Sequence, residues 1–201
     1  MIRLLLADDQ QLVRAGLTAL LSMKPDLEVV AETSTGTDVA ALVAEHSVDV
    51  ALLDIEMPGV NGIDAAAEIA KATPGCRSII VTTFARLGYL KRALAAGATG
   101  FVVKDTPPEQ LAEAIRRVYR GLRVVDPALA EESLFTPDDP LTDREADIAR
   151  LILQGHDSAH IAAALHLSNG TVRNHQSALI AKTGASNRFA AAQTARDNGW
   201  L

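Results

Sequence analysis

The chain has 201 residues, a formal net charge of −6 and a single cysteine, Cys76. This length suits one large domain or two modest ones, and the composition is that of an ordinary globular protein. No apolar run reaches the roughly 18 residues that span a bilayer, the N-terminus lacks a signal-peptide layout, and one cysteine excludes an intramolecular disulfide, so we expect a cytoplasmic protein without membrane insertion.

Short apolar runs alternate with segments of helical periodicity through the first part of the chain. Five runs have the length of strands, and they cover residues 2–7, 27–31, 50–53, 77–82 and 100–103. Runs that are apolar on both faces are typical of a parallel sheet covered by helices. The pattern therefore predicts a doubly wound (βα)5 sheet over residues 1–121. Its last helix is expected to be capped by Thr106 and to end at Gly121.

The periodicity fails after this domain and returns in a wholly helical form. We interpret residues 122–139 as a linker, with a helical turn near residues 128–134. Residues 140–201 are predicted to form a small all-α domain of four helices. The signals for its helix ends are a capping box at Thr142 and Glu145, starts at Asp157, Ser168 and Ser186, and stops at Gly155 and Gly184.

Polar side chains stand at the carboxyl ends of four predicted strands. These residues are Asp8 and Asp9, Asp54, Thr82 and Lys104. The carboxyl ends of parallel strands meet at one edge of a sheet, where open α/β sheets bind ligands, so we expect these side chains to converge. Three neighbouring carboxylates repel one another unless a cation lies among them, and oxygen ligands suit Mg²⁺.

We interpret Asp54 as a carboxylate that accepts a phosphoryl group. An aspartate can attack phosphorus when a metal ion and the ammonium group of Lys104 offset the developing charge, and Thr82 offers a hydroxyl group to a phosphoryl oxygen. Taken singly, an aspartate pair after a strand is usually a helix start, and a lysine there is usually a solvated charge. Because all of these residues stand at strand ends, we favour a phosphoryl-accepting site over these ordinary interpretations.

The second domain has the dimensions of a helix–turn–helix motif between Ile161 and Thr171. Polar residues near the start of the following helix suit a recognition helix, and residues 168–188 contain three basic residues and no acid. Without further context, a small helical packing domain with a solvated face is equally compatible with this pattern.

The first predicted domain resembles the receiver domain of bacterial two-component response regulators. The matching positions are Asp8-Asp9, Asp54, Met57-Pro58, Gly62, Thr82-Thr83 and Phe101 to Lys104. The resemblance implies that Asp54 is the phosphoacceptor and that Thr82 and Lys104 hold the phosphoryl group. It also implies that Mg²⁺ is bound by Asp8, Asp9, Asp54 and the backbone carbonyl of Glu56. Phe101 falls where the family has an aromatic ring that turns inward after Thr82 moves, although a plain core aromatic is equally compatible.

The second domain resembles the four-helix DNA-binding domain of the LuxR/FixJ/NarL type. The motifs are Leu141 to Glu145, Ile161-Ala162, Ser168 to His175, Lys182 to Gly184, and Arg188. The resemblance implies base-edge contacts by Arg173, Asn174 and Ser177, and phosphate or framework contacts by Thr171, Lys182 and Arg188. Shorter matches resemble the DesR-type subfamily, which implies a membrane-stress or lipid-fluidity response.

These resemblances together imply a transcriptional regulator and its partners. A sensor histidine kinase would phosphorylate Asp54, and the homodimer would bind promoter DNA, with RNA polymerase as a further candidate partner. Two dimer faces stay open, namely the first and fifth receiver helices (Leu17, Leu20, Leu21, Ala114, Val118) and the fourth and fifth (Tyr89, Arg92, Arg117).

Two alternatives stay open as well. The first is a haloacid-dehalogenase-like phosphatase, although that family has an aspartate where this chain has Glu56. The second is a receiver whose output domain binds protein or RNA.

Overall fold

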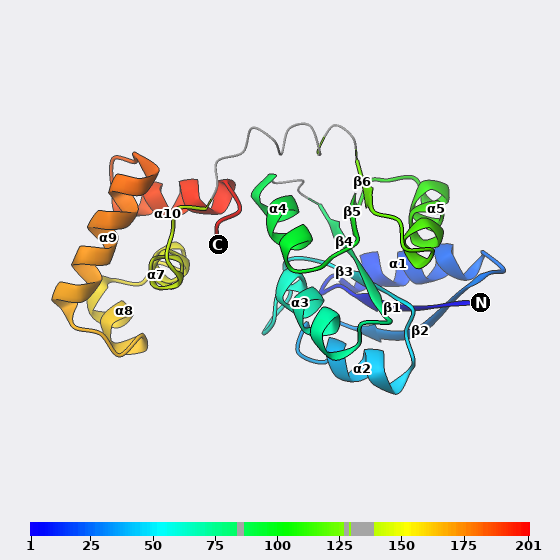
Figure 1. Ribbon diagram of the computed structural model, residues 1–201. Coiled ribbons are helices and arrows are strands. Elements are labelled where there is room, and N and C mark those ends of the chain that lie inside the picture. Colours follow the sequence, from blue (N-terminus) through cyan, green and yellow to red (C-terminus); the bar gives the residue numbers. More distant parts are fainter. Residues whose placement is uncertain (84–86, 127–128, 130–138) are drawn as a thin grey trace. The chain divides into compact units, whose positions relative to one another are not determined.

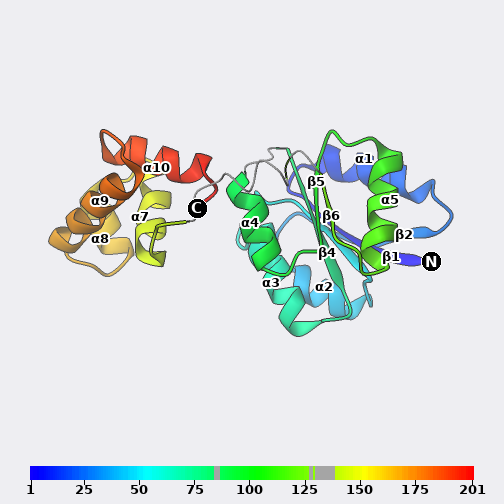
Figure 2. The same ribbon diagram turned by 45° about the horizontal axis from the view of Figure 1, so that its top comes forward.

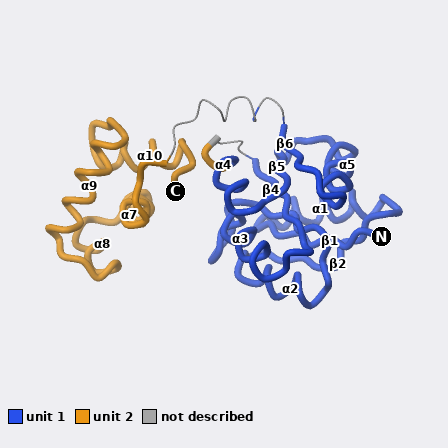
Figure 3. The backbone as a smooth tube through the Cα atoms, in the orientation of Figure 1, with its two compact units in different colours: residues 1–85, 90–132 blue, residues 86–89, 133–201 orange. Residues whose placement is uncertain are grey.

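The computed structural model describes residues 1–83, 87–126, 129 and 139–201. The chain divides into two compact units, one of residues 1–85 and 90–132 and the other of residues 86–89 and 133–201 (Figure 3). Within the described ranges, no helix is long and apolar enough to cross a membrane.

The first unit is built on a six-stranded parallel sheet with the strand order β2-β1-β3-β4-β5-β6. The strands are β1 (Ile2–Ala7), β2 (Leu27–Thr33), β3 (Val50–Leu53), β4 (Arg77–Thr82), β5 (Gly100–Val103) and β6 (Val124–Val125). The helices that alternate with them are α1 (Gln11–Ser22), α2 (Val39–Glu45), α3 (Gly62–Ala72), α4 (Leu87–Ala95) and α5 (Pro108–Tyr119).

Helices cover both faces of this sheet, which confirms the predicted fold class. In Figures 1 and 2, α1 and α5 lie against one face, while α2 and α3 lie against the other. Side chains of a strand alternate between faces, so Leu4 and Leu6 of β1 join a core with Leu21 and Ile115, while Leu5 points to the opposite side. Every residue of β3 is buried because both of its faces are covered.

The sixth strand departs from the five that were predicted. Val124 pairs with Gly100 and Val125 with Phe101, so the sheet continues into the segment interpreted as linker. A strand of two residues carries no measurable periodicity, and only its pairing with β5 reveals it. The predicted helical turn near residues 128–134 lies outside the described residues, except for Leu129, which is helical.

The N-terminal cap of α5 also lies one residue later than predicted. The cap position is Pro107 rather than Thr106, and Pro108 is the first helical residue. Proline suits this position because its missing N–H would have no partner there.

Residues 139–201 of the second unit form four helices. They are α7 (Asp143–Leu153), α8 (Ser158–Ala164), α9 (Asn169–Thr183) and α10 (Arg188–Asp197). Their inward residues form one apolar cluster that includes Ile148, Ile161, Val172 and Leu179. The four predicted helices are therefore confirmed.

Local sequence signals set most of the helix ends in this unit. The capping box between Thr142 and Glu145 forms, and Asp157 and Ser168 each accept a backbone N–H of the helix that follows. Gly184 ends α9 with φ +65, a left-handed conformation that suits glycine. One prediction is off by a residue, since α10 is capped by Asn187 and not by Ser186.

We predict that Gly62→Ala destabilises the first unit. A Cβ atom at Gly62 would lie 2.0 Å from the carbonyl oxygen of Asp54, and this neighbour is backbone that cannot turn away. We expect a loss of at least about 2 kcal/mol in the free energy of unfolding, measured by urea denaturation.

Gly16→Ala is the matched control for this substitution. Gly16 lies within α1, and a Cβ atom added there would have nothing within 4 Å, so we expect a gain of about 0.5–1 kcal/mol from helix propensity. Equal stability of the two variants would contradict the close approach between Gly62 and Asp54.

Candidate functional site

The predicted site residues follow strands that are neighbours in the sheet. The strand order reverses between β1 and β3, which is where doubly wound sheets form a crevice at the carboxyl ends of their strands. Asp54 continues β3 and its backbone N–H donates to the carbonyl oxygen of Ala7 at 2.8 Å. Lys104 continues β5 and donates in the same way to Thr82 at 2.8 Å. The sheet itself therefore brings these residues to one edge.

The acidic side chains converge as the sequence predicted. Asp8, Asp9 and Asp54 each offer a carboxylate oxygen within 4.8 Å of the others. Lys104 lies among them, with its Nζ 2.8 Å from Asp8 Oδ2 and 3.1 Å from Asp54 Oδ2. Asp8 and Asp54 are each only 4% exposed, whereas Asp9 is exposed. One ammonium group thus bridges two buried carboxylates.

Burial controls the protonation of this cluster. It raises the pKa of Asp54 from 3.8 to about 6, against the opposing effect of the Lys104 ammonium group and with a further rise from Asp8. Burial alone would lower the pKa of Lys104, but its hydrogen bonds and ionic attraction to Asp8 and Asp54 outweigh that effect and raise it. The structure therefore favours a charged lysine beside a carboxylate that is costly to ionise, and a cation at this position would relieve the cost.

The other residues that the resemblance singled out lie on neighbouring strands or in the loop after Asp54. Thr82 is buried at the end of β4, and Phe101 of β5 is only 1% exposed. Glu56 lies in the loop after Asp54 with its side chain exposed. The roles of Glu56 in metal binding and of Thr82 and Phe101 in switching remain predictions.

One residue that supports this site carries no signal in the sequence. Arg14 of α1 donates from Nη1 to the backbone carbonyl of Asp8, and its Nε lies 3.4 Å from Glu32 Oε2. No spacing rule links Arg14 to Asp8 or Glu32, since α1 must first fold against the sheet to bring them together. Cys76, which is buried, plays no part here, and burial raises the pKa of its thiol to about 12.

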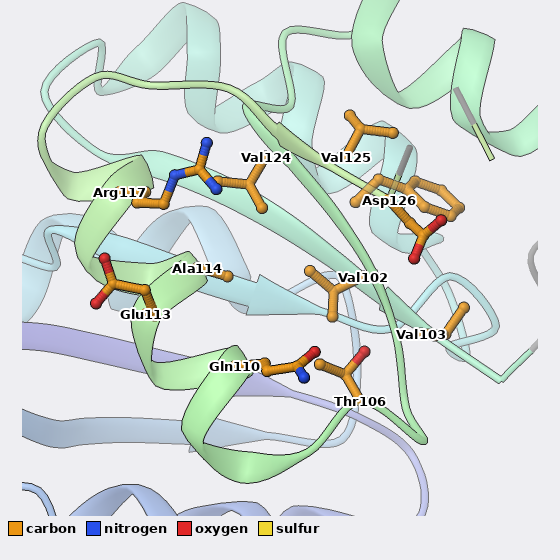
Figure 4. A pocket seen from close by; sticks show the side chains of 11 residues that line it. Val102, Val103, Thr106, Gln110, Glu113, Ala114, Arg117, Val124, Val125 and Asp126 are labelled. Carbon is orange, nitrogen blue, oxygen red and sulfur yellow. The ribbon is translucent and has the colours of Figure 1, made fainter. Parts of the chain in front are cut away.

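A separate pocket of about 300 Å³ lies between β5, β6 and α5 (Figure 4). Val102 and Val124 contribute apolar lining, while Gln110 and Arg117 contribute polar groups. None of the three clustered aspartates lines this pocket, so it is distinct from the acidic site.

In the second unit, α9 presents the expected polar face. Arg173, Asn174 and Ser177 are exposed, whereas Val172 and Leu179 are buried in the helical core. Helices α8 and α9 are joined by a tight turn in which His166 has a positive φ of 56. The three candidate base-reading residues therefore share one solvent-facing side of a helix.

The other predicted DNA contacts also hold the unit together. Lys182 Nζ lies 2.6 Å from Glu145 Oε2, and the Glu145 side chain also accepts the backbone N–H of Thr142. Arg188 donates to Ser158 Oγ at 3.1 Å, while the hydroxyl of Thr171 lies 2.9 Å from that of Ser168. These contacts agree with a framework role for Thr171, Lys182 and Arg188. Their contact with DNA phosphates stays a prediction.

Comparison with known proteins identifies both units. Residues 4–116 match the family described as "Response regulator receiver domain", and residues 139–195 match "Bacterial regulatory proteins, luxR family". The chain is 42% identical to the transcriptional regulatory protein DesR of Bacillus subtilis, over the whole of both chains.

Solved structures give the same result. The response regulator ChrA of a heme-sensing two-component system matches with 34% identity and a TM-score of 0.59, covering 100% of this chain and 98% of that one. A DNA-binding response regulator of the LuxR family from Staphylococcus aureus is 37% identical with a TM-score of 0.57, covering 59% of this chain and 99% of that one. These matches favour a DNA-binding regulator over the phosphatase alternative and over an output domain that binds protein or RNA.

We predict that Asp54→Asn stabilises the metal-free protein at pH 7. Because the folded-state pKa of Asp54 is raised from 3.8 to about 6, its protonated form stabilises the fold at low pH, and this contribution is lost as the pH rises through about 6. We expect the substitution to recover roughly 1–3 kcal/mol at pH 7. Urea denaturation in EDTA at several pH values measures this. If the free energies of unfolding of wild type and variant differ by a constant amount between about pH 4 and pH 7, the raised pKa of Asp54 is not the cause of the difference.

Proposed function

The chain belongs to the two-component response regulators that join a receiver domain to a LuxR-type DNA-binding domain, and on this premise we propose that Asp54 receives the phosphoryl group. Proteins of this build are phosphorylation-dependent transcriptional regulators, and this chain is one of them. The observation that carries the proposal is the position of Asp54, buried at the end of β3 with Oδ2 3.1 Å from Lys104 Nζ. A sensor histidine kinase is the proposed phosphodonor.

Mg²⁺ is the cation that fits the donor set. Asp8, Asp9 and Asp54 supply only carboxylate oxygens, one of them on an exposed residue, and the backbone carbonyl of Glu56 would add a neutral oxygen. Mg²⁺ prefers such hard ligands and keeps several waters, which leaves room for a phosphoryl oxygen. The bound ion would offset negative charge on the transferred group, while Lys104 would offset it from the side of β5.

The new phosphoryl group would then act through Thr82 and Phe101. It brings negative charge and three acceptor oxygens to a place where Lys104 already bridges two carboxylates. Thr82 ends the strand beside β3, so its hydroxyl could turn towards a phosphoryl oxygen. Phe101 belongs to the next strand and pairs with Ile80, so a shift of Thr82 would reach its packing.

A dimer would form through the exposed side of α1 and its C-terminal cap. Leu12 and Met23 are 86% and 77% exposed, and Leu20 is 39% exposed. Their spacing places these apolar side chains on one side of the helix, where they form an unpartnered surface. Of the residues first considered for this face, Leu21, Ala114 and Val118 belong instead to the buried core. Dimerisation would place two recognition helices on half-sites about one helical turn of DNA apart.

The second unit would bind promoter DNA with α9 in the major groove. Arg173, Asn174 and Ser177 are proposed to contact base edges, while Thr171, Lys182 and Arg188 are proposed to contact phosphates or to support the helix. A DNA partner and a single cysteine both fit work in the cytoplasm.

We predict that Asp54→Asn abolishes phosphorylation and the dimer that follows from it. Wild-type protein given acetyl phosphate and Mg²⁺ should take up one phosphoryl group and shift from monomer to dimer, as measured by intact mass and analytical ultracentrifugation. Asp64→Asn, an exposed aspartate of α3, is the matched control and should behave like the wild type.

Leu12→Asp should separate phosphorylation from dimerisation. A charge on the exposed side of α1 should weaken the dimer by at least about tenfold without reducing phosphoryl uptake. Ala41→Asp adds the same charge at an exposed position of α2, outside both of the dimer faces first considered, and serves as its control. Equal dimerisation of wild type and Asp54→Asn in acetyl phosphate would overturn the switch, and steady turnover of p-nitrophenyl phosphate would favour the phosphatase alternative.

We predict that Arg173→Ala weakens binding to duplex DNA. Loss of a bidentate base contact costs about 1–3 kcal/mol, which corresponds to a roughly 5- to 150-fold rise in Kd. Gel shifts with duplexes selected from a random pool by the wild-type protein would measure this. Arg150→Ala removes an exposed arginine from α7 that pairs with Asp147, and this control should leave Kd unchanged. Unaltered binding by Arg173→Ala would remove this residue from the interface.

A further inference from the structure

A glutamine occupies a core position of the proposed recognition helix. Val172, Gln176 and Leu179 follow one another at intervals of four and three residues, and all three are buried, with Gln176 only 7% exposed. The other two belong to the apolar cluster of the second unit. Burying an amide among such residues costs free energy unless hydrogen bonds replace those lost to water.

Gln176 is the end of a hydrogen-bond chain that crosses three helices. Arg188 Nη1 of α10 donates to Ser158 Oγ of α8 at 3.1 Å, and Ser158 Oγ donates to Gln176 Oε1 of α9 at 3.3 Å. The amide is only half satisfied, because within the described residues Gln176 Nε2 is buried without a hydrogen-bond partner. A leucine would fill this position at a lower energetic cost. What the glutamine adds is the hydrogen bond from Ser158, the residue that in turn accepts a hydrogen bond from Arg188.

Arg188 is well suited to use this support. It is the first residue of α10, it is half-buried, and only one of its five N–H groups is engaged in the contacts of the described residues. A guanidinium group that is already held in place loses less side-chain entropy when it binds a phosphate. Residues that hold Arg188 in place would therefore raise the affinity for DNA without contacting DNA themselves.

We propose that Gln176 and Ser158 are positioning residues that hold the Arg188 guanidinium group for a DNA phosphate. This inference rests on the proposed DNA-binding function of the second unit. It assigns Gln176 to the inner side of the recognition helix and Arg173 to its outer side, so one helix contributes to base contacts and to a phosphate contact through opposite faces.

Three variants of the full chain test this proposal. Gln176→Leu removes the amide, Ser158→Ala removes the hydroxyl group, and Arg188→Met removes the guanidinium group while keeping most of the aliphatic stem. Asp157 continues to cap α8 in the Ser158→Ala variant because that cap uses its own side chain. Fluorescence anisotropy with a mixed-sequence duplex, repeated over a range of salt concentrations, measures binding to phosphates independently of the operator.

Arg188→Met should reduce the slope of log K against log salt by about 0.9. Gln176→Leu and Ser158→Ala should each raise Kd by about three- to thirtyfold. They should also reduce the slope of log K against log salt, but by less than Arg188→Met does. In a chain that already carries Arg188→Met, Gln176→Leu and Ser158→Ala should each change Kd by less than about twofold. Ser158→Thr, which keeps a hydroxyl group, should restore most of the affinity.

Stability separates positioning from a structural role. We expect Gln176→Leu to unfold at the same or a higher urea concentration than the wild type, so that affinity falls while stability does not. Gln154→Leu, at the exposed end of α7, is the matched control and should not change Kd.

Unchanged DNA affinity of Gln176→Leu would overturn the proposal. So would a loss of affinity that is equally large with and without Arg188→Met, because that result would mark Gln176 as a structural residue. If the wild-type chain fails to bind duplex DNA at all, the proposed function itself fails, and this outcome is recognised before any variant is measured.

Discussion

The bridge that Lys104 makes between Asp8 and Asp54 is the interaction on which the acidic site depends. Two carboxylates that are almost wholly buried would repel each other strongly in a medium of low dielectric constant, and one ammonium group at 2.8 and 3.1 Å offsets only part of this repulsion. Burial is the main cause of the raised pKa of Asp54, and the neighbouring charge of Asp8 raises it further. Such a site is stabilised by a ligand that brings positive charge, and the proposed phosphoryl group would change its charge balance.

The proposed switch would therefore act through the sheet and not through a surface loop. Asp54 and Lys104 each continue a strand, Thr82 ends one, and these strands are hydrogen-bonded to their neighbours, so a displacement at one of these residues would be transmitted to the next strand along. Phe101 lies in this series, buried between the site and the edge strand β6. The arrangement requires a rigid sheet on which a few side chains can take two positions.

The second unit uses charge differently. Its buried carboxylate, Glu145, is satisfied by Lys182 and by the backbone of Thr142, and although burial opposes ionisation, these hydrogen bonds hold its pKa below the ordinary value. That cluster holds α7 against the end of α9, whereas the chain from Gln176 leaves one amide group unsatisfied. A fully satisfied polar cluster suits stability, while a partly satisfied one suggests a position kept for function.

The sequence by itself determined the fold class, the four C-terminal helices and the position of the acidic site. Strand and helix periods, capping residues such as Thr142 and Ser168, and acids at strand ends are consequences of local backbone geometry, so they can be recognised without knowing what packs where. Only the tertiary structure decided that β6 exists, that Leu21 belongs to the core and Leu12 to the surface, and that Arg14 reaches Asp8. The physical reason is that burial and long-range hydrogen bonds depend on which element covers which, and this information is absent from any short window of the chain.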